Sequence, residues 1–232
     1  MTPETTGPVA GPHQNQPLVL GGASLGEARG AVVLVHGRGD SADGILGLAD
    51  ALGVPGFGAP GIAYLAPQAA GSTWYPNSFL APLAANEPGL SSGLRAVGDA
   101  LARAEAAGIP PERIVVAGFS QGACLASEFA ARHGERLGGV VALSGGLIGT
   151  AEVAGAAPPD DKRFDYAGSL DGTPVFLGCS DVDAHIPLAR VTRSAEVFRT
   201  LGGAVTERIY PGMGHTVVED ELAFFRALLA GL

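Results

Sequence analysis

Short runs of apolar residues alternate with longer amphipathic segments along most of this chain. The run AVVLV at residues 31–35 is rich in β-branched residues, as expected for a strand buried on both faces of a sheet. Five further runs are expected to form strands, at residues 62–66, 113–118, 139–143, 174–177 and 205–210. Five helical patterns are found, at residues 43–52, 91–107, 121–133, 188–201 and 216–229. This alternation predicts an α/β fold with a mainly parallel central sheet and helices on both faces.

The length and composition predict one domain preceded by a short arm. The chain has 232 residues, of which 47% are hydrophobic, so a disordered protein is excluded and a sizeable core is possible. Residues 1–17 are rich in Pro, Gly, Thr and Gln, and we expect a mobile N-terminal arm there, followed by a single domain over residues 18–232. The polar stretch at residues 149–172 is expected to be a loop or small excursion within that domain.

The net charge of −9 disfavours nucleic acids and anionic membrane surfaces as partners. No apolar run reaches the roughly 18 residues of a membrane span. The first residues lack the basic start and apolar stretch of a secretory signal, so we expect a cytoplasmic protein. Two cysteines do not make a disulfide framework, and no metal-ligand cluster or phosphate-binding loop is recognisable. We therefore expect a small-molecule substrate and neither metal nor cofactor, while monomer and homodimer both stay open.

The most specific local motif is GFSQG at residues 118–122, which lies between a predicted strand and a predicted helix. A G-x-S-x-G sequence in that context places its serine on a sharp strand-to-helix turn, with the hydroxyl exposed and the helix N-terminus beneath it. Gly118 and Gly122 leave room for the neighbouring backbone. We therefore predict that Ser120 is a nucleophile.

A serine hydroxyl needs a base, and the base needs an orienting acid. Among the five histidines, His215 lies in a turn between the last predicted strand and the last helix, which suits the chain order of serine, acid and histidine. The acid is expected after the preceding strand, where Asp181 and Asp183 compete. We favour Asp183, which lies deeper in the loop, and regard Asp181 as a carboxylate that braces the turn.

An oxyanion hole requires two preorganised N–H donors. The backbone N–H of Gln121, directly after the nucleophile, is expected to be one of them. The other is expected from the loop after the first predicted strand, where the N–H of Arg38 is the best candidate and His36 is interpreted as a structural residue.

Candidate pocket residues come from loops at the expected carboxyl edge of the sheet, where ligands bind in such folds. Trp74, Tyr75 and Phe79 either wall an apolar pocket or cap the core, and the sequence leaves these alternatives open. Leu147 and Ile186 are weaker candidates for the same pocket.

With these residues in place, the chain resembles the phospholipase/carboxylesterase family of serine hydrolases, which includes acyl-protein thioesterases. Four segments carry the resemblance, in the order HGRGD at 36–40, GFSQGA at 118–123, DAHIP at 183–187 and GMGH at 212–215. It implies an α/β-hydrolase fold without a large lid domain, a triad of Ser120, Asp183 and His215, and an oxyanion hole at the backbone of Arg38 and Gln121. Residues 74–88 resemble a bacterial carboxylesterase subgroup more than the depalmitoylating enzymes.

We therefore predict a serine carboxylesterase that hydrolyses esters, or thioesters, of small to medium acyl chains through an acyl-enzyme. A lysophospholipase or acyl-protein thioesterase is one alternative. A dienelactone-hydrolase-like enzyme would need a cysteine nucleophile, but Cys124 is expected to face the core one helical turn beyond Ser120. Two non-enzymatic alternatives are an inactive binding module and adhesion through the RGDS sequence at 38–41.

Overall fold

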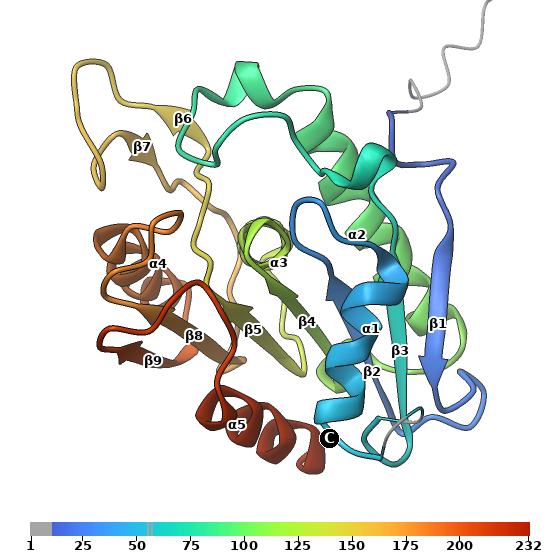
Figure 1. Ribbon diagram of the computed structural model, residues 1–232. Coiled ribbons are helices and arrows are strands. Elements are labelled where there is room, and N and C mark those ends of the chain that lie inside the picture. Colours follow the sequence, from blue (N-terminus) through green and yellow to red (C-terminus); the bar gives the residue numbers. More distant parts are fainter. Residues whose placement is uncertain (1–10, 55, 57) are drawn as a thin grey trace, which may run out of the picture.

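The computed structural model describes residues 11–54, 56 and 58–232. Within them, seven strands form one sheet in the order β1-β3-β2-β4-β5-β8-β9, in which only β1 runs antiparallel to its neighbour (Figure 1). These strands are β1 (Leu18–Gly22), β2 (Gly30–Val35), β3 (Ile62–Pro67), β4 (Ile114–Phe119), β5 (Gly139–Leu143), β8 (Pro174–Ser180) and β9 (Ala204–Tyr210). The prediction of a mainly parallel α/β sheet is confirmed, and all six predicted strands are present.

Helices cover both faces of the sheet, as predicted (Figure 1). Side chains of β2 alternate between two apolar cores, with Val33 on one face and Val32 on the other, because successive residues of a strand point in opposite directions. Residues of α2, α3 and α4 pack into the first core, and residues of α1 and α5 pack into the second. The five helices are α1 (Ala42–Ala51), α2 (Gly89–Ala106), α3 (Gln121–His133), α4 (Leu188–Thr200) and α5 (Glu219–Ala230).

Part of the predicted N-terminal arm belongs to the described residues, and that part contacts the domain. Residues 1–10 lie outside the described residues. Residues 11–17 pack against the domain, because the ring of His13 bonds the Trp74 carbonyl at 2.9 Å and accepts the Ala70 N–H at 3.0 Å. The His13 backbone N–H also donates to the Ser92 hydroxyl at 2.9 Å. These partners are distant in sequence, so composition alone does not indicate them.

The excursion at residues 149–172 carries a two-stranded hairpin of β6 (Ala151–Glu152) and β7 (Lys162–Arg163). The Glu152 carboxylate accepts the Leu83 N–H at 2.6 Å and pairs with the Lys162 ammonium at 3.2 Å. Lys162 also donates to the Ala81 carbonyl at 2.9 Å. The hairpin is thus fixed to the loop that precedes α2, as the neighbouring positions of β6 and that loop in Figure 1 illustrate.

The last helix begins at Glu219, three residues later than its pattern predicts, and Glu221 closes its first turn. One carboxylate oxygen of Glu221 accepts the Val218 N–H at 2.9 Å. The other is buried with no hydrogen-bond partner among the described residues. Burial therefore raises the pKa of Glu221 to about 7, although the Val218 N–H opposes the shift.

This pKa makes the stability of the fold depend on pH. Because the folded state binds the Glu221 proton more tightly than the unfolded state, its contribution is full below pH 4.5 and is lost as the pH rises toward 7. Relative to Glu221→Gln, we expect the wild type to lose about 1–3 kcal/mol of unfolding free energy across this window. Urea unfolding of both proteins at several pH values measures the difference, and parallel pH profiles would contradict it.

Candidate active site

Ser120 occupies the sharp bend between β4 and α3. Its backbone has φ 56° and ψ −121°, a conformation that L-residues rarely adopt. Glycines on either side permit the bend, since a Cβ at Gly118 would lie 2.5 Å from the Gly122 backbone and a Cβ at Gly122 would lie 2.1 Å from the Val35 carbonyl oxygen. The motif thus holds Ser120 at the N-terminus of α3, where unpaired N–H groups favour a developing negative charge.

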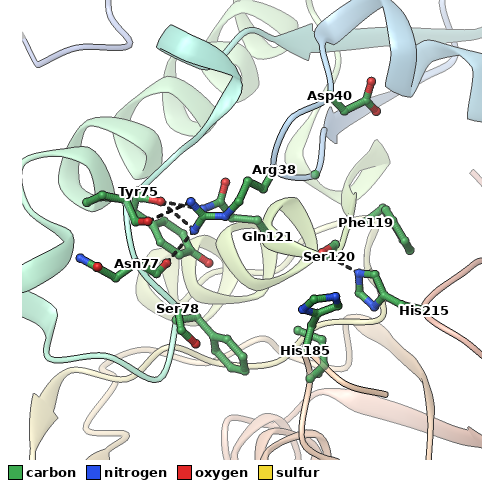
Figure 2. A pocket seen from close by; sticks show the side chains of 14 residues that line it. Arg38, Asp40, Tyr75, Asn77, Ser78, Phe119, Ser120, Gln121, His185 and His215 are labelled. Atoms are coloured by element: carbon green, nitrogen blue, oxygen red, sulfur yellow. Dashed lines mark hydrogen bonds between the residues drawn. The ribbon is translucent and has the colours of Figure 1, made fainter. Parts of the chain in front are cut away.

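Three side chains from distant parts of the chain meet at the carboxyl ends of β4, β8 and β9. The Ser120 hydroxyl is 2.8 Å from Nε2 of His215, and Nδ1 of His215 is 2.7 Å from Oδ2 of Asp183 (Figure 2 shows the first pair). An ionised carboxylate only accepts, so Nδ1 donates to Asp183 and Nε2 is left to accept the serine proton. This arrangement can generate a serine nucleophile.

Asp183 is held as an anion by its surroundings. Its side chain has no exposed surface, and its second oxygen accepts the backbone N–H groups of His185 at 2.8 Å and Ile186 at 3.0 Å. Burial alone would raise the pKa of Asp183, but the bonds from His215 and from these amides outweigh burial and lower it. The acid therefore keeps its charge beside the imidazole.

The competing carboxylate, Asp181, points elsewhere. Its Oδ1 accepts the Gly212 N–H at 2.7 Å, three residues before His215. The neighbouring Ser180 hydroxyl donates to the Met213 carbonyl. The loop that carries the acid is thus tied directly to the loop that carries the histidine, and Asp181 braces that connection.

The loop after β2 passes beside Ser120 and is held by the buried His36. Nδ1 of His36 donates to the Gly37 carbonyl at 2.7 Å, and its Nε2 accepts the Ala69 N–H at 3.1 Å. Burial lowers the pKa of His36, consistent with this neutral tautomer. Arg38 and Gln121, whose backbone N–H groups are the expected oxyanion donors, border the same cleft as Ser120.

A cleft of about 460 Å³ opens at Ser120 and His215. Of the predicted pocket residues, Tyr75, Phe79 and Ile186 line it. Trp74 and Leu147 do not. The indole of Trp74 is fully buried, with its N–H donating to the His36 carbonyl at 2.9 Å, and Leu147 is buried with its N–H bonded to the Ser194 hydroxyl.

Seven lining residues belong to none of the predicted pocket, triad or oxyanion-hole positions, namely Gly37, Asp40, Pro76, Asn77, Ser78, Phe119 and His185. The rings of Phe119 and His185 each lie 4.9 Å, centre to centre, from the His215 ring. Both could have been found in the sequence, because Phe119 belongs to the elbow motif and His185 to the acid loop. Asn77 and Ser78 follow the aromatic pair at 74–75 after Pro76, and Figure 2 shows Tyr75, Asn77 and Ser78 in the same stretch of chain.

Both thiols are buried and unsuited to nucleophilic chemistry. Burial raises the pKa of Cys124 to about 12 and that of Cys179 to about 12. Within the described ranges, no three His, Cys, Asp or Glu side chains gather in a way that could hold a metal ion. No helix in the described part of the chain is long and apolar enough to cross a membrane.

Comparison with known proteins gives consistent matches. The sequence pattern of the phospholipase/carboxylesterase family matches residues 23–231. Acyl-protein thioesterase 1 of Eremothecium gossypii is 30% identical over 222 residues, covering 87% of this chain and 89% of that protein. The thioesterase of the same name from Gibberella zeae is 36% identical over 122 residues, covering 53% of this chain and 49% of that protein. The chain spans about half the length of several such curated relatives.

A solved structure gives a match over nearly the whole chain. The phospholipase/carboxylesterase from Dyadobacter fermentans shares 38% sequence identity and superimposes with a TM-score of 0.82. The match covers 93% of this chain and 97% of that protein.

The close contact at Gly122 generates a stability prediction. Gly122→Ala forces α3 away from β2, and we expect a loss of about 1–3 kcal/mol of unfolding free energy. Gly47→Ala is the matched control, because Gly47 lies in α1 and a Cβ there would meet no atom within 4 Å, so we expect a gain of about 0.5–1 kcal/mol. Chemical denaturation measures both, and equal effects of the two substitutions would contradict the packing argument.

Proposed function

This chain belongs to the phospholipase/carboxylesterase family, and we propose that it is a serine carboxylesterase acting on esters with small to medium acyl chains. The observation that carries the proposal is the continuous hydrogen-bonded series from Ser120 through His215 to Asp183 at a strained elbow. Family membership alone would not assign these residues their roles.

In the acylation step, Ser120 Oγ attacks the ester carbonyl carbon while Nε2 of His215 takes its proton. Asp183 accepts the Nδ1–H and stabilises the imidazolium. The carbonyl oxygen becomes an oxyanion, which the backbone N–H groups of Arg38 and Gln121 bind. When the tetrahedral intermediate collapses, His215 gives its proton to the leaving alcohol and the acyl group stays on Ser120.

Deacylation repeats these steps with water. His215 takes a proton from a water molecule, whose oxygen attacks the acyl carbon, and the same two N–H donors hold the second oxyanion. The carboxylic acid leaves as the proton returns to Ser120 Oγ. The reaction needs no redox group, because every bond change is an acyl or a proton transfer.

The size and lining of the cleft support a substrate of modest length. Its volume of about 460 Å³ falls in the lower part of the roughly 300–1,000 Å³ typical of small-molecule sites. Apolar Phe79 and Ile186 share its wall with polar Asn77 and Ser78. A second candidate function, hydrolysis of acyl thioesters, is favoured by the names of the curated relatives.

Substitution of the proposed triad tests the mechanism. We expect Ser120→Ala to lower kcat by about 10⁶ and Asp183→Asn to lower it by about 10⁴, because the nucleophile is lost in one and the imidazole tautomer in the other. Asp181→Asn is the matched control, since asparagine keeps the oxygen that accepts the Gly212 N–H. Hydrolysis of a short p-nitrophenyl ester measures all three, and full activity of Ser120→Ala would refute the assignment.

Two reagents distinguish this mechanism from its alternatives. A fluorophosphonate should label Ser120 and abolish activity, whereas iodoacetamide should leave activity intact because burial raises the pKa of Cys124 to about 12. Loss of activity with iodoacetamide alone would favour a cysteine enzyme. No labelling by the fluorophosphonate would favour an inactive hydrolase fold that only binds its ligand.

A chain-length series tests the substrate. With p-nitrophenyl esters, we expect kcat/KM to be highest for acyl chains that fit the cleft and to fall for long-chain esters, whose ends extend beyond it. The same series of acyl thioesters and a lysophospholipid extends the measurement to the alternatives. A maximum at the longest thioester would replace the carboxylesterase proposal with an acyl-thioesterase.

A further inference from the structure

The side chains of the two proposed oxyanion-hole residues hold one and the same stretch of backbone. We propose that the guanidinium of Arg38 is a positioning group that sets the oxyanion donor against the cleft wall by clamping residues 73–77, which we call the clamped segment. The inference rests on the proposed function, because it concerns how that reaction's backbone donors are held. It assigns to Arg38 a role for its side chain in addition to its backbone N–H.

Arg38 binds three consecutive carbonyl groups of the clamped segment. Its Nη1 donates to Pro76 at 2.9 Å, and its Nη2 donates to Tyr75 at 2.9 Å and to Asn77 at 2.7 Å. Figure 2 shows the side chain extended away from Ser120, toward Tyr75 and Asn77. The planar guanidinium, with its donors in a fixed fork, suits such a set of acceptors, and a lysine ammonium lacks that geometry.

Gln121 holds the same segment from α3. Its Oε1 accepts the Trp74 N–H at 2.9 Å and the Thr73 hydroxyl at 3.3 Å, and its Nε2 donates to the Tyr75 carbonyl at 2.8 Å. The Tyr75 carbonyl thus receives both Arg38 and Gln121. Loss of either side chain therefore removes one of the bonds that hold the Tyr75 carbonyl, and the other side chain keeps its own bond there.

The loop that carries Arg38 depends on such ties. Gly37 and Gly39 flank Arg38, and Gly39 has φ +81° with nothing near its missing side chain, so the backbone is intrinsically free there. Besides the bond from the Ala69 N–H to the His36 ring, two bonds join the backbone of this loop to the neighbouring chain, from the Trp74 indole to the His36 carbonyl and from the Gly39 N–H to the Ser72 carbonyl. In sequence, Arg38 lies between the two loop residues that make these bonds, His36 and Gly39. The Arg38 side chain adds a further connection to the clamped segment.

The clamped segment also forms part of the cleft wall. Tyr75 and Asn77 line the cleft together with Ser78 and Phe79. The buried Asn86 amide fixes the continuation of the wall, accepting the Asn77 N–H at 2.9 Å and donating to the Ser78 carbonyl at 2.9 Å. A substrate that contacts this wall is therefore positioned by the clamped segment, to which the loop with the proposed oxyanion donor is bonded.

Substitutions at Arg38 test the proposal. We expect Arg38→Ala and Arg38→Lys both to lower kcat by about 10- to 100-fold for a neutral ester, with a much smaller change in KM, because a displaced donor is felt mainly in the transition state. Arg95→Ala, at an exposed position of α2, is the control and should retain wild-type kinetics. Thermal unfolding of each variant checks that it is folded.

Two further readouts separate positioning from a general loss of structure. Guanidinium ion added to Arg38→Ala should restore part of kcat, with no such gain for the wild type or for Arg95→Ala. The affinity for a trifluoromethyl ketone, which forms an oxyanion on Ser120, should fall in parallel with kcat/KM, whereas that of a neutral amide analogue should change little. In the double variant Arg38→Ala/Gln121→Met, the fold loss of kcat should be less than the product of the two single losses, because both side chains hold one segment.

Several results would overturn the proposal. Wild-type kcat in Arg38→Lys would show that the fork is unnecessary and that a positive charge suffices. A loss confined to KM, and largest for acidic esters, would make Arg38 a substrate-binding charge instead. If Arg38→Ala does not fold, Arg38→Lys and the ketone affinity still decide. Full activity of Ser120→Ala would instead refute the proposed function, a result that these Arg38 measurements do not mimic.

Discussion

The close approach of α3 to β2 is the constraint on which the rest of the site depends. With no side chain at Gly122, the first turn of α3 lies directly against the Val35 and His36 carbonyls, and Ser120 is forced into its left-handed bend. The N-terminus of α3 therefore lies at the carboxyl edge of the sheet, beside the loops that follow β2, β8 and β9. A strained residue persists only where its surroundings fix it, and here backbone contacts on both sides of the elbow do so.

Asp183 and His215, the proposed acid and base, are held together by bonds between the loops that carry them. Ser180 and Asp181 bind the backbone of the histidine loop, while Asp183 binds the imidazole itself. Two adjacent parallel strands carry these loops, and their register brings Ser180 beside Tyr210. The hydrogen bonds between side chain and backbone replace the regular ladder where the strands end, so the geometry of His215 does not rest on one contact.

Much of the fold and of the candidate site could be predicted from the sequence, because the signals that indicate them are local. Strands buried on both faces are continuous apolar runs, and the elbow is defined by five consecutive residues. The missed features are the ones that depend on distant partners. The edge strand β1 is short, half-exposed and ends in two glycines, so its pattern is weak. His13 is held by atoms of residues 70, 74 and 92, which the local sequence does not indicate. Trp74 can lie in the core because the His36 carbonyl accepts its indole N–H.

Several buried polar side chains near the site bond loop backbone and do not contact Ser120. Loops at the end of a sheet leave backbone N–H and C=O groups unpaired, and an unpaired group costs about 1–3 kcal/mol when it is buried. His36, Gln121 and Asn86 each pair such groups, and each is largely or fully buried. Arg38 likewise pairs backbone groups, namely the three consecutive carbonyls of residues 75–77. Because the same bonds fix the loop positions, pairing the backbone groups and preorganising the proposed donors are achieved together, and under our proposal residues that never touch the reacting atoms influence the rate.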